Sequence, residues 1–238
     1  MNEKVILLNS GGADSMASAG ILLTTGFDLV GLNMDYGQVV WARERMAAER
    51  WTKALQERFG KERISIQAVT LRDYHTFVNT NPVVRGIALG TEVDQAVNFV
   101  PGRNILFLLF AAIYGYDRNL RKIALSGQET DHVAGDLSIE FQDSMARMLS
   151  IGMGTRGKKE PYEIWSPLLR LGYRKSDAAK WLIKNNFPVE LSWSCYTPSE
   201  IHCGRCHQCR ERREAFAEAA LKDPTEYELR QESRAEGE

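Results

Sequence analysis

The segment Ser10 to Ser15 (SGGADS) has the residue types of an anion-binding loop. It lies between an apolar stretch and a predicted helix, where glycines let the backbone approach an anion, the helix start offers free N–H groups, and serines add hydroxyl donors. Asp14 would repel phosphate, so we expect it to cap the helix or to hold a Mg²⁺ ion that bridges to a nucleotide. The spacing fits neither a Walker loop nor a dinucleotide fingerprint. An ordinary tight turn is the alternative.

The second group of chemistry-bearing residues lies near the C-terminus, where all four cysteines are found: Cys195, Cys203, Cys206 and Cys209. Four thiolates at this spacing can form a tetrahedral cage, and Gly204 permits a tight turn between the second and third ligands. Zinc is the predicted ion, and because sulfur fills every position its role is structural. An iron–sulfur cluster and four buried free cysteines are the alternatives.

Basic and histidine residues accompany these cysteines in the sequence. The negative charge of a four-thiolate site is predicted to be offset by four arginines, Arg205, Arg210, Arg212 and Arg213. His202 and His207 could replace thiolates as ligands, but with four cysteines present we interpret both as exposed neighbours.

Length and composition limit the classes of protein to consider. The chain has 238 residues and a mass of 26.9 kDa, which suits one large domain. Its formal charge of -1 argues against broad affinity for nucleic acid or membranes. The N-terminus lacks the features of a leader peptide, and no apolar run reaches the roughly 20 residues needed to span a bilayer. A cytoplasmic location is therefore expected, where cysteines bind metal more often than they form disulfides.

Short apolar runs alternate with helical patterns along the chain, which predicts a parallel sheet covered by helices. Strands are expected to start at residues 5, 29, 64, 122 and 163. A first helix is expected from about Asp14 to Gly26, and an amphipathic helix over 41–59. The run over 104–116 is apolar all round, so we expect a helix buried between the sheet and another element. Residues 75–100 show little periodicity and are predicted to form a functional or mobile loop.

Six motifs in this order give the chain a resemblance to the 7-cyano-7-deazaguanine synthases of the PP-loop ATP pyrophosphatase superfamily. They are SGGADS at 10–15, MDYGQ at 34–38, VPGRN at 100–104, SPLLRLGYRKSD at 166–177, ELSWSCY at 190–196 and CGRCHQCRERREAF at 203–216. The resemblance extends to about Pro224. It implies a doubly wound α/β fold with a five-stranded parallel sheet, an ATP site at the first motif and a zinc-bearing C-terminal region. A homodimer is expected.

The resemblance also implies the reaction. ATP adenylates the carboxylate of 7-carboxy-7-deazaguanine, pyrophosphate leaves, ammonia displaces AMP to give an amide, and a second ATP-dependent activation yields the nitrile. Positioning and charge stabilisation are then the main tasks of the protein.

The motifs place candidate residues for each task. The ATP site is predicted from Leu8, Ser10, Gly11, Gly12, Asp14, Ser15 and Asp35. Lys175 would neutralise phosphate charge, and Asp35 would serve the adenosine or the metal, or cap a helix. Arg103 suits a substrate carboxylate or a phosphate, and Asn104 follows it at the same turn. A structural loop is the alternative role for this pair.

One segment departs from the family pattern. Typical members have an acid followed by Gly-Tyr-Pro-Asp-Cys-Arg, whereas this chain reads ETDHVAGDLSIEF over 129–141, about two residues shorter. Asp131 and Asp136 match the two acids, and Asp136 is expected to hold the substrate edge that carries an N–H beside an amino group, or to cap the following helix. The change concerns what is bound near the carboxylate, or which amine attacks it.

The sequence therefore leaves three interpretations. The first is a synthase with ammonia as acceptor, and the second is a paralogue of the kind found beside antiviral defence genes, which joins the deazaguanine to another amine such as a protein N-terminus. The third is a zinc-stabilised binding protein without catalysis. We expect an ATP-binding and substrate domain over 1–187, a metal-binding region over 188–224 within the same compact unit, and an acidic tail over 225–238.

Overall fold

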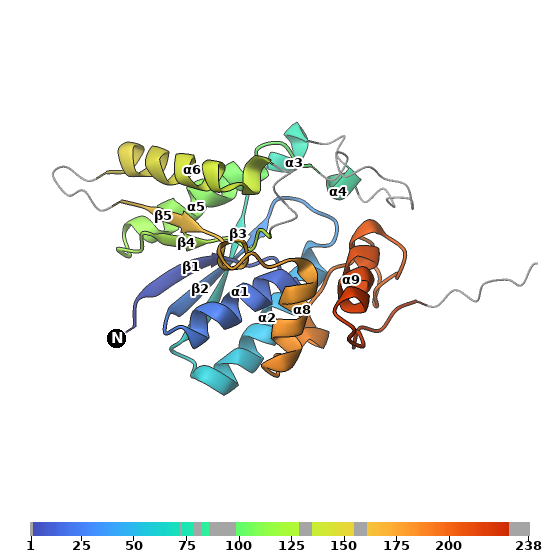
Figure 1. Cartoon of the computed structure of the whole chain (residues 1–238). Helices are drawn as coiled ribbons and strands as arrows, with labels where there is room; N and C mark the ends of the chain where they lie inside the picture. The colour runs from blue at the N-terminus through green and yellow to red at the C-terminus, as the bar shows by residue number, and fades with distance from the viewer. Residues whose placement is uncertain are drawn as a thin grey trace, which may run out of the picture.

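The protein contains a five-stranded sheet in which every neighbouring pair of strands is parallel (Figure 1). The computed structural model describes residues 2–71, 73–78, 82–85, 99–128, 135–154 and 161–228. The strands are β1 (Lys4–Leu8), β2 (Asp28–Asp35), β3 (Ile64–Thr70), β4 (Lys122–Ala124) and β5 (Glu163–Trp165). Their order is β3-β2-β1-β4-β5, so the chain turns from one half of the sheet to the other between β1 and β4. The predicted doubly wound fold is confirmed.

Helices cover both faces of this sheet (Figure 1). On one face lie α1 (Ala13–Thr24), α2 (Trp41–Phe59) and α8 (Lys175–Lys184), and on the other lie α5 (Arg103–Tyr116) and α6 (Ile139–Gly152). The helix α9 (His207–Glu218) packs against α8. Short elements complete the fold: α3 (Tyr74–Phe77), α4 (Pro82–Arg85), α7 (Pro167–Arg170), η3 (Gly135–Leu137) and η4 (Val189–Leu191).

The amphipathic helix predicted over 41–59 is confirmed as α2. Its buried face carries Ala48, Trp51 and Leu55, and Trp51 and Leu55 join the core between the sheet and α1. The strand β1 lies in the middle of the sheet and is apolar on both faces, as a covered parallel strand must be: Val5 and Leu7 join one core, and Ile6 joins the other. The core therefore holds the end of β1 rigidly at the centre of the fold.

The helix α5 is only partly buried. Its buried residues include Leu108, Ala111 and Ala112, but Ile105 is 44% exposed and Ile113 is 51% exposed. The helix packs against β1, β4 and α6, as expected for a helix between the sheet and another element, but these two apolar side chains are not buried. Across the described residues, no helix combines the length and the apolar character needed to cross a bilayer.

The segment predicted as an irregular loop over 75–100 is only partly described. It contains the end of α3 and the short helix α4, and residues 79–81 and 86–98 of it lie outside the described residues. Val83 and Val84 are buried in a small apolar cluster with Tyr36 and Tyr74. This cluster supports the polar residues at the start of α5.

Candidate active site

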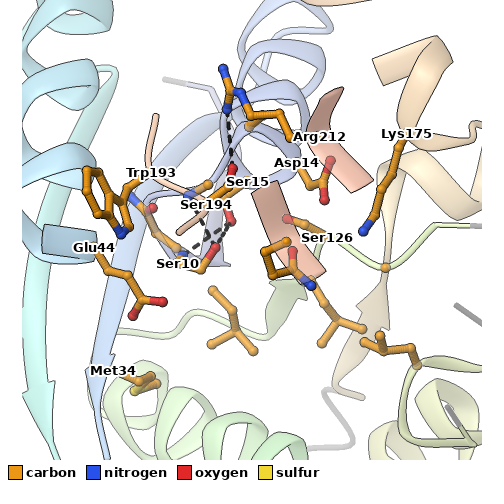
Figure 2. A pocket seen from close by; sticks show the side chains of 18 of the residues that line it. Ser10, Asp14, Ser15, Met34, Glu44, Ser126, Lys175, Trp193, Ser194 and Arg212 are labelled. Carbon is orange, nitrogen blue, oxygen red and sulfur yellow. Dashed lines mark hydrogen bonds between the residues drawn. The ribbon is translucent and has the colours of Figure 1, made fainter. Parts of the chain in front are cut away.

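A cavity of about 300 Å³ lies at the carboxyl edge of the sheet, where ligands bind in open α/β folds (Figure 2). Its walls come from the ends of three strands, from the loop after β1 and from the starts of α1, α5 and α8. The C-terminal region closes one side. Predicted site residues that line it are Leu8, Ser10, Gly12, Asp14, Ser15, Arg103, Asn104 and Lys175. The structure thus gathers residues that lie far apart in the sequence.

The loop after β1 presents the positive end of α1 to this cavity. Gly12 is the N-cap residue, and no side chain caps the helix. Ser10 Oγ and Ser15 Oγ lie 2.9 Å apart, and Ser10 N donates to Ser15 Oγ at 3.2 Å. The two hydroxyls therefore hold each other in place at the helix start, where backbone N–H groups attract anions.

Gly11 is required here by its neighbours as well as by its backbone. Its φ is +80°, and a Cβ atom at this position would lie 2.2 Å from the backbone oxygen of Glu44 on α2. Trp193 N donates to Gly11 O at 3.0 Å from the opposite side. A side chain at position 11 would push the loop away from α2, so glycine fixes the position of the anion site.

Asp14 and Lys175 face the same part of the cavity (Figure 2). Asp14 lies in the first turn of α1, and the N-cap position belongs to Gly12. Lys175 is the first residue of α8 and forms an ion pair with Glu211 on α9. His207 lies 3.4 Å from the other oxygen of the Glu211 carboxylate. The arrangement places one cation and one carboxylate beside the N-terminal end of α1.

Arg103 occupies the opposite side of the cavity in an aromatic setting. Its guanidinium lies 5.9 Å from the centre of the Tyr36 ring. Burial alone would lower the pKa of Arg103, but the nearby Tyr36, Tyr196 and Asp136 raise it above its usual range, so the side chain keeps its charge. A charged guanidinium in partly buried surroundings binds carboxylates and phosphates strongly. Arg103 is the first residue of α5 and lines the cavity, so it does not lie in a structural loop, which was the alternative.

Asp136 reaches the site through Asn104. Asn104 Nδ2 donates to Asp136 Oδ2 at 2.9 Å, and Asn104 itself lines the cavity. Asp136 belongs to η3 and does not cap α6, since the cap is Ser138, whose side chain accepts a hydrogen bond from Phe141 N. The capping alternative is therefore wrong. Asp131 lies outside the described residues.

Among the described residues predicted for ATP or substrate binding, Gly11, Asp35 and Asp136 do not line the cavity, and the side chain of Asp35 turns away from it. The Asp35 carboxylate accepts a hydrogen bond from Gly37 N at 3.1 Å, which stabilises the turn after β2. The predicted contact with adenosine or metal is not supported, because the position at the end of β2 fixes the backbone but the side chain turns back on its own loop.

Several residues that line the cavity were not among the site residues predicted from the sequence. Glu44 and Trp193 line the cavity from α2 and from the C-terminal region, and Ser126 follows β4 at the same edge. Ser126 could have been predicted as a cavity residue, because it lies at the carboxyl end of a predicted strand and ligands bind at that end of a parallel strand. Glu44 gave no signal, because charged residues are common on an amphipathic surface helix.

The four cysteines form one buried cluster, and their ligand atoms all lie within 4.8 Å of one another. A tetrahedral ion with metal–sulfur bonds of about 2.3 Å requires sulfurs roughly 3.8 Å apart, and Cys195 Sγ and Cys206 Sγ are 4.0 Å apart. Backbone N–H groups of Thr197 and Cys203 donate to Cys195 Sγ at 3.3 Å and 3.4 Å. The donor set and its size fit a single thiophilic metal ion.

The histidines and one arginine near this cage differ from expectation. His202 is buried, 4.3 Å from the Trp193 ring, and its Nε2 accepts a hydrogen bond from Ser194 N at 3.1 Å. Burial lowers its pKa to about 4, so it is a neutral packing residue and not the exposed neighbour predicted. Arg212 turns from the cage toward the cavity and donates to Ser192 Oγ at 2.8 Å and to Ser194 Oγ at 3.3 Å (Figure 2).

The start of the predicted tail packs against the cage. Glu228 N donates to His202 O at 2.8 Å, and the Tyr227 hydroxyl donates to Asp223 at 2.5 Å. Residues 225–228 therefore belong with the metal-binding region, contrary to expectation, and residues 229–238 lie outside the described part of the chain.

The chain is similar to known proteins over almost its whole length. A family model described as queuosine biosynthesis protein QueC matches residues 4–220. The 7-cyano-7-deazaguanine synthase of Thermoplasma volcanium is 32% identical over 230 residues, covering 95% of this chain and 92% of that protein. The synthase of the same name from Methanoculleus marisnigri is 32% identical over 227 residues, covering 95% of this chain and 99% of that protein.

Solved structures with a similar fold share little sequence with the chain. NMN synthetase from Francisella tularensis is 13% identical with a TM-score of 0.49, covering 93% of this chain and 79% of that one. The U34-tRNA thiolase NcsA from Methanococcus maripaludis, solved with its 4Fe–4S cluster, is 14% identical with a TM-score of 0.44. The match covers 90% of this chain and 63% of that one.

Proposed function

This chain belongs to the family of queuosine biosynthesis protein QueC and is an enzyme, and from that premise we propose that it is an ATP-dependent carbon–nitrogen ligase acting on 7-carboxy-7-deazaguanine. The observation that supports this most strongly is that one cavity is lined by the start of α1, by the cation of Lys175 and by the cation of Arg103. Such a site suits a reaction between a triphosphate and a carboxylate, because each anion needs its own positive group.

The reaction begins with attack of the substrate carboxylate oxygen on the α-phosphorus of ATP. The bond from that phosphorus to the bridging oxygen breaks, and pyrophosphate leaves with the electron pair. Ser10, Gly12 and Ser15 hold the phosphates at the start of α1, and Lys175 stabilises the charge that develops on the leaving group. Asp14 would hold Mg²⁺, and the charge of that ion would offset the repulsion between this carboxylate and phosphate. The product is an acyl adenylate.

Ammonia then attacks the acyl carbon, AMP leaves, and the nitrogen loses a proton to give the amide. In a second round the amide oxygen attacks another ATP, pyrophosphate leaves again, and loss of AMP and protons gives the nitrile. Arg103 orients the substrate carboxylate, and Asn104 and Asp136 hold the base of the substrate. The protein positions the reactants and excludes water from the adenylate.

The cysteine cage would hold one structural zinc ion. Four buried sulfurs within 4.8 Å of one another suit a single tetrahedral ion, whereas a cluster of several iron atoms needs a wider cage. With four sulfur ligands the ion has no open position for a substrate, so its role is to fix α9 and the segment that contains Trp193.

Incubation with ATP, 7-carboxy-7-deazaguanine and ammonium, followed by mass spectrometry, tests the proposed function. We expect pyrophosphate, AMP, the amide and then the nitrile. The Lys175→Met variant should lose this activity, and Lys180→Met, an exposed position on the same helix, is the matched control. Pyrophosphate release that requires the carboxylate but gives no amide would reject ammonia as the acceptor.

A second acceptor is favoured by the altered segment at 129–141. If the attacking amine belongs to a protein N-terminus, as in a paralogue of a defence system, the adenylate forms in the same way but ammonia gives no product. Adenylate formation with a stalled second step, relieved by a peptide with a free N-terminus, would support this alternative. Residues 129–134 lie outside the described part of the chain, so the proposal is based on the sequence change alone.

We also propose that the protein forms a homodimer in the cytoplasm through the uncovered face of α5. Ile105, Phe110 and Ile113 are exposed there at 44%, 37% and 51%. Light scattering after gel filtration, with Ile113→Glu as the disrupting variant, tests this assembly.

A further inference from the structure

Glu44 places a carboxylate in the cavity on the β2 side of the anion-binding loop, near Met34 (Figure 2). The residue lies in the first turn of α2, and its backbone oxygen is the atom that Gly11 packs against. Among the described residues Glu44 has one side-chain hydrogen bond, from Gln38 Nε2 to its Oε2 at 2.9 Å. Arg103 acts on it only through longer-range charge.

The orientation of Gln38 is fixed by its other hydrogen bonds. Its Oε1 accepts from Tyr36 N at 2.9 Å, and its Nε2 also donates to Met34 O at 3.0 Å. The amide cannot turn over without losing both bonds, so Gln38 always presents a donor to Glu44. One oxygen of the Glu44 carboxylate is therefore occupied, and the other is left to accept a hydrogen bond from a ligand.

The surroundings of this carboxylate are mainly apolar. Leu8, Leu32 and Met34 line the same cavity from β1 and β2. Burial raises the pKa of Glu44 above its usual value, in keeping with its place in the cavity wall. Apolar walls with a single hydrogen-bonding group suit the edge of an aromatic base.

Electrostatics favours the base over the other parts of a nucleotide. The phosphates are expected at the start of α1. The Glu44 carboxylate repels phosphate, so the repulsion is smallest when the phosphates lie far from Glu44. In ATP the base is the part furthest from the γ-phosphate, and its exocyclic amino group is a hydrogen-bond donor.

We propose that Glu44, held by Gln38, accepts a hydrogen bond from the exocyclic amino group of adenine and so makes the enzyme select ATP over purine nucleotides with a carbonyl at that position. The inference rests on the proposed ATP-dependent function. A carbonyl oxygen in place of the amino group would face the carboxylate acceptor to acceptor, and both groups would lose their hydrogen bonds to water without replacement.

The test compares the binding of ATP and inosine triphosphate, which carries the carbonyl, by calorimetry with Mg²⁺ and no deazaguanine. In Glu44→Gln the oxygen of the new amide stays with Gln38, so its NH₂ group faces the base. We expect ATP affinity to fall roughly 10- to 100-fold and inosine triphosphate affinity to stay equal or rise. Glu57→Gln, an exposed position on the same helix, should leave both affinities unchanged.

Two further measurements keep the result decisive. Glu44→Asp retains the charge but draws it back from the base, so it should also lower the preference for ATP; it serves if Glu44→Gln does not fold. Binding of 2′-deoxy-ATP reports on the ribose, and an effect of Glu44→Gln on that nucleotide different from its effect on ATP would assign Glu44 to the ribose and overturn the proposal. An unchanged ratio of ATP to inosine triphosphate would overturn it as well, whereas failure of the parent protein to bind ATP would reject the proposed function instead.

Discussion

Lys175 on α8 forms an ion pair with Glu211 on α9. Glu211 follows Cys209, the last of the four cysteines, on the same helix. The side chains of the pair are 24% and 23% exposed. This ion pair links the metal-binding region to the cation that faces the anion-binding loop. The position of Lys175 therefore depends on residues that lie on a separate helix.

Replacement of the two partners should affect catalysis very differently. Lys175→Met removes a charge that stabilises the leaving group, so we expect the rate of pyrophosphate release to fall by about 10²- to 10³-fold. Glu211→Gln only loosens the position of the lysine, and because a partly exposed ion pair contributes up to about 1 kcal/mol, the expected loss is at most about fivefold. Steady-state release of pyrophosphate measures both. Equal losses in the two variants would show that Glu211 itself contacts the reactants.

Gly11 offers a test of the loop position with an internal control. Gly11→Ala places a Cβ atom 2.2 Å from Glu44 O at a φ of +80°, so we expect a loss of about 2–3 kcal/mol in the free energy of unfolding and a loss of nucleotide binding. Gly26→Ala has a similarly positive φ of +97° but nothing within 4 Å, so it carries the backbone strain without the clash. Denaturant unfolding of both variants separates the two effects. Equal losses of stability would mean that the contact with α2 is unimportant.

The cysteine cage should be necessary for the cavity as well as for the C-terminal region. We expect one zinc ion per chain by elemental analysis, and chelation should unfold this region because the binding energy of the ion is part of its folding energy. Trp193 donates to Cys195 O at 2.8 Å and lines the cavity, so loss of the ion should also weaken ATP binding. Purified protein that contains iron instead of zinc would refute the assignment. Protein that keeps its ATP affinity after chelation would separate the cage from the site.

The sequence predicted the parts of this protein that depend on local pattern. The five strands, the amphipathic helix α2 and the SGGADS loop follow from periodicity and residue type, and the structure confirms the fold that they imply. The cage was predicted because all four cysteines lie between Cys195 and Cys209, at a spacing that permits a tetrahedral site.

Features that depend on the direction of a single side chain were not predictable. Asp35 stands at the correct edge of the sheet, but its carboxylate turns to Gly37 N. Arg212 lies among the cysteines in the sequence, but helical geometry directs it to Ser192 and Ser194. The exposure of Ile113 depends on how many helices cover one face of the sheet, which the composition of α5 does not reveal.

The last prediction concerns Asp136, which is hydrogen-bonded to Asn104 and lies in the described part of the segment 129–141. Asp136 Oδ2 accepts a hydrogen bond from Asn104 Nδ2 at 2.9 Å. The remaining acceptor sites of this carboxylate are then expected to bind the N–H and the neighbouring amino group of the deazaguanine. In Asp136→Asn one acceptor becomes a donor, and we expect the affinity for 7-carboxy-7-deazaguanine to fall by roughly 2 kcal/mol while ATP affinity stays unchanged.

Calorimetric titration of the variant with each ligand measures the two affinities. Asp143→Asn on the exposed side of α6 is the control, since it removes one carboxylate nearby without touching Asn104. If the variant binds the deazaguanine carboxylate as tightly as the parent, Asp136 serves only to hold Asn104, and recognition of the substrate base then falls to residues of the segment before Gly135. A parallel loss of ATP affinity would instead indicate that the change had disturbed the start of α5, where Arg103 and Asn104 lie side by side.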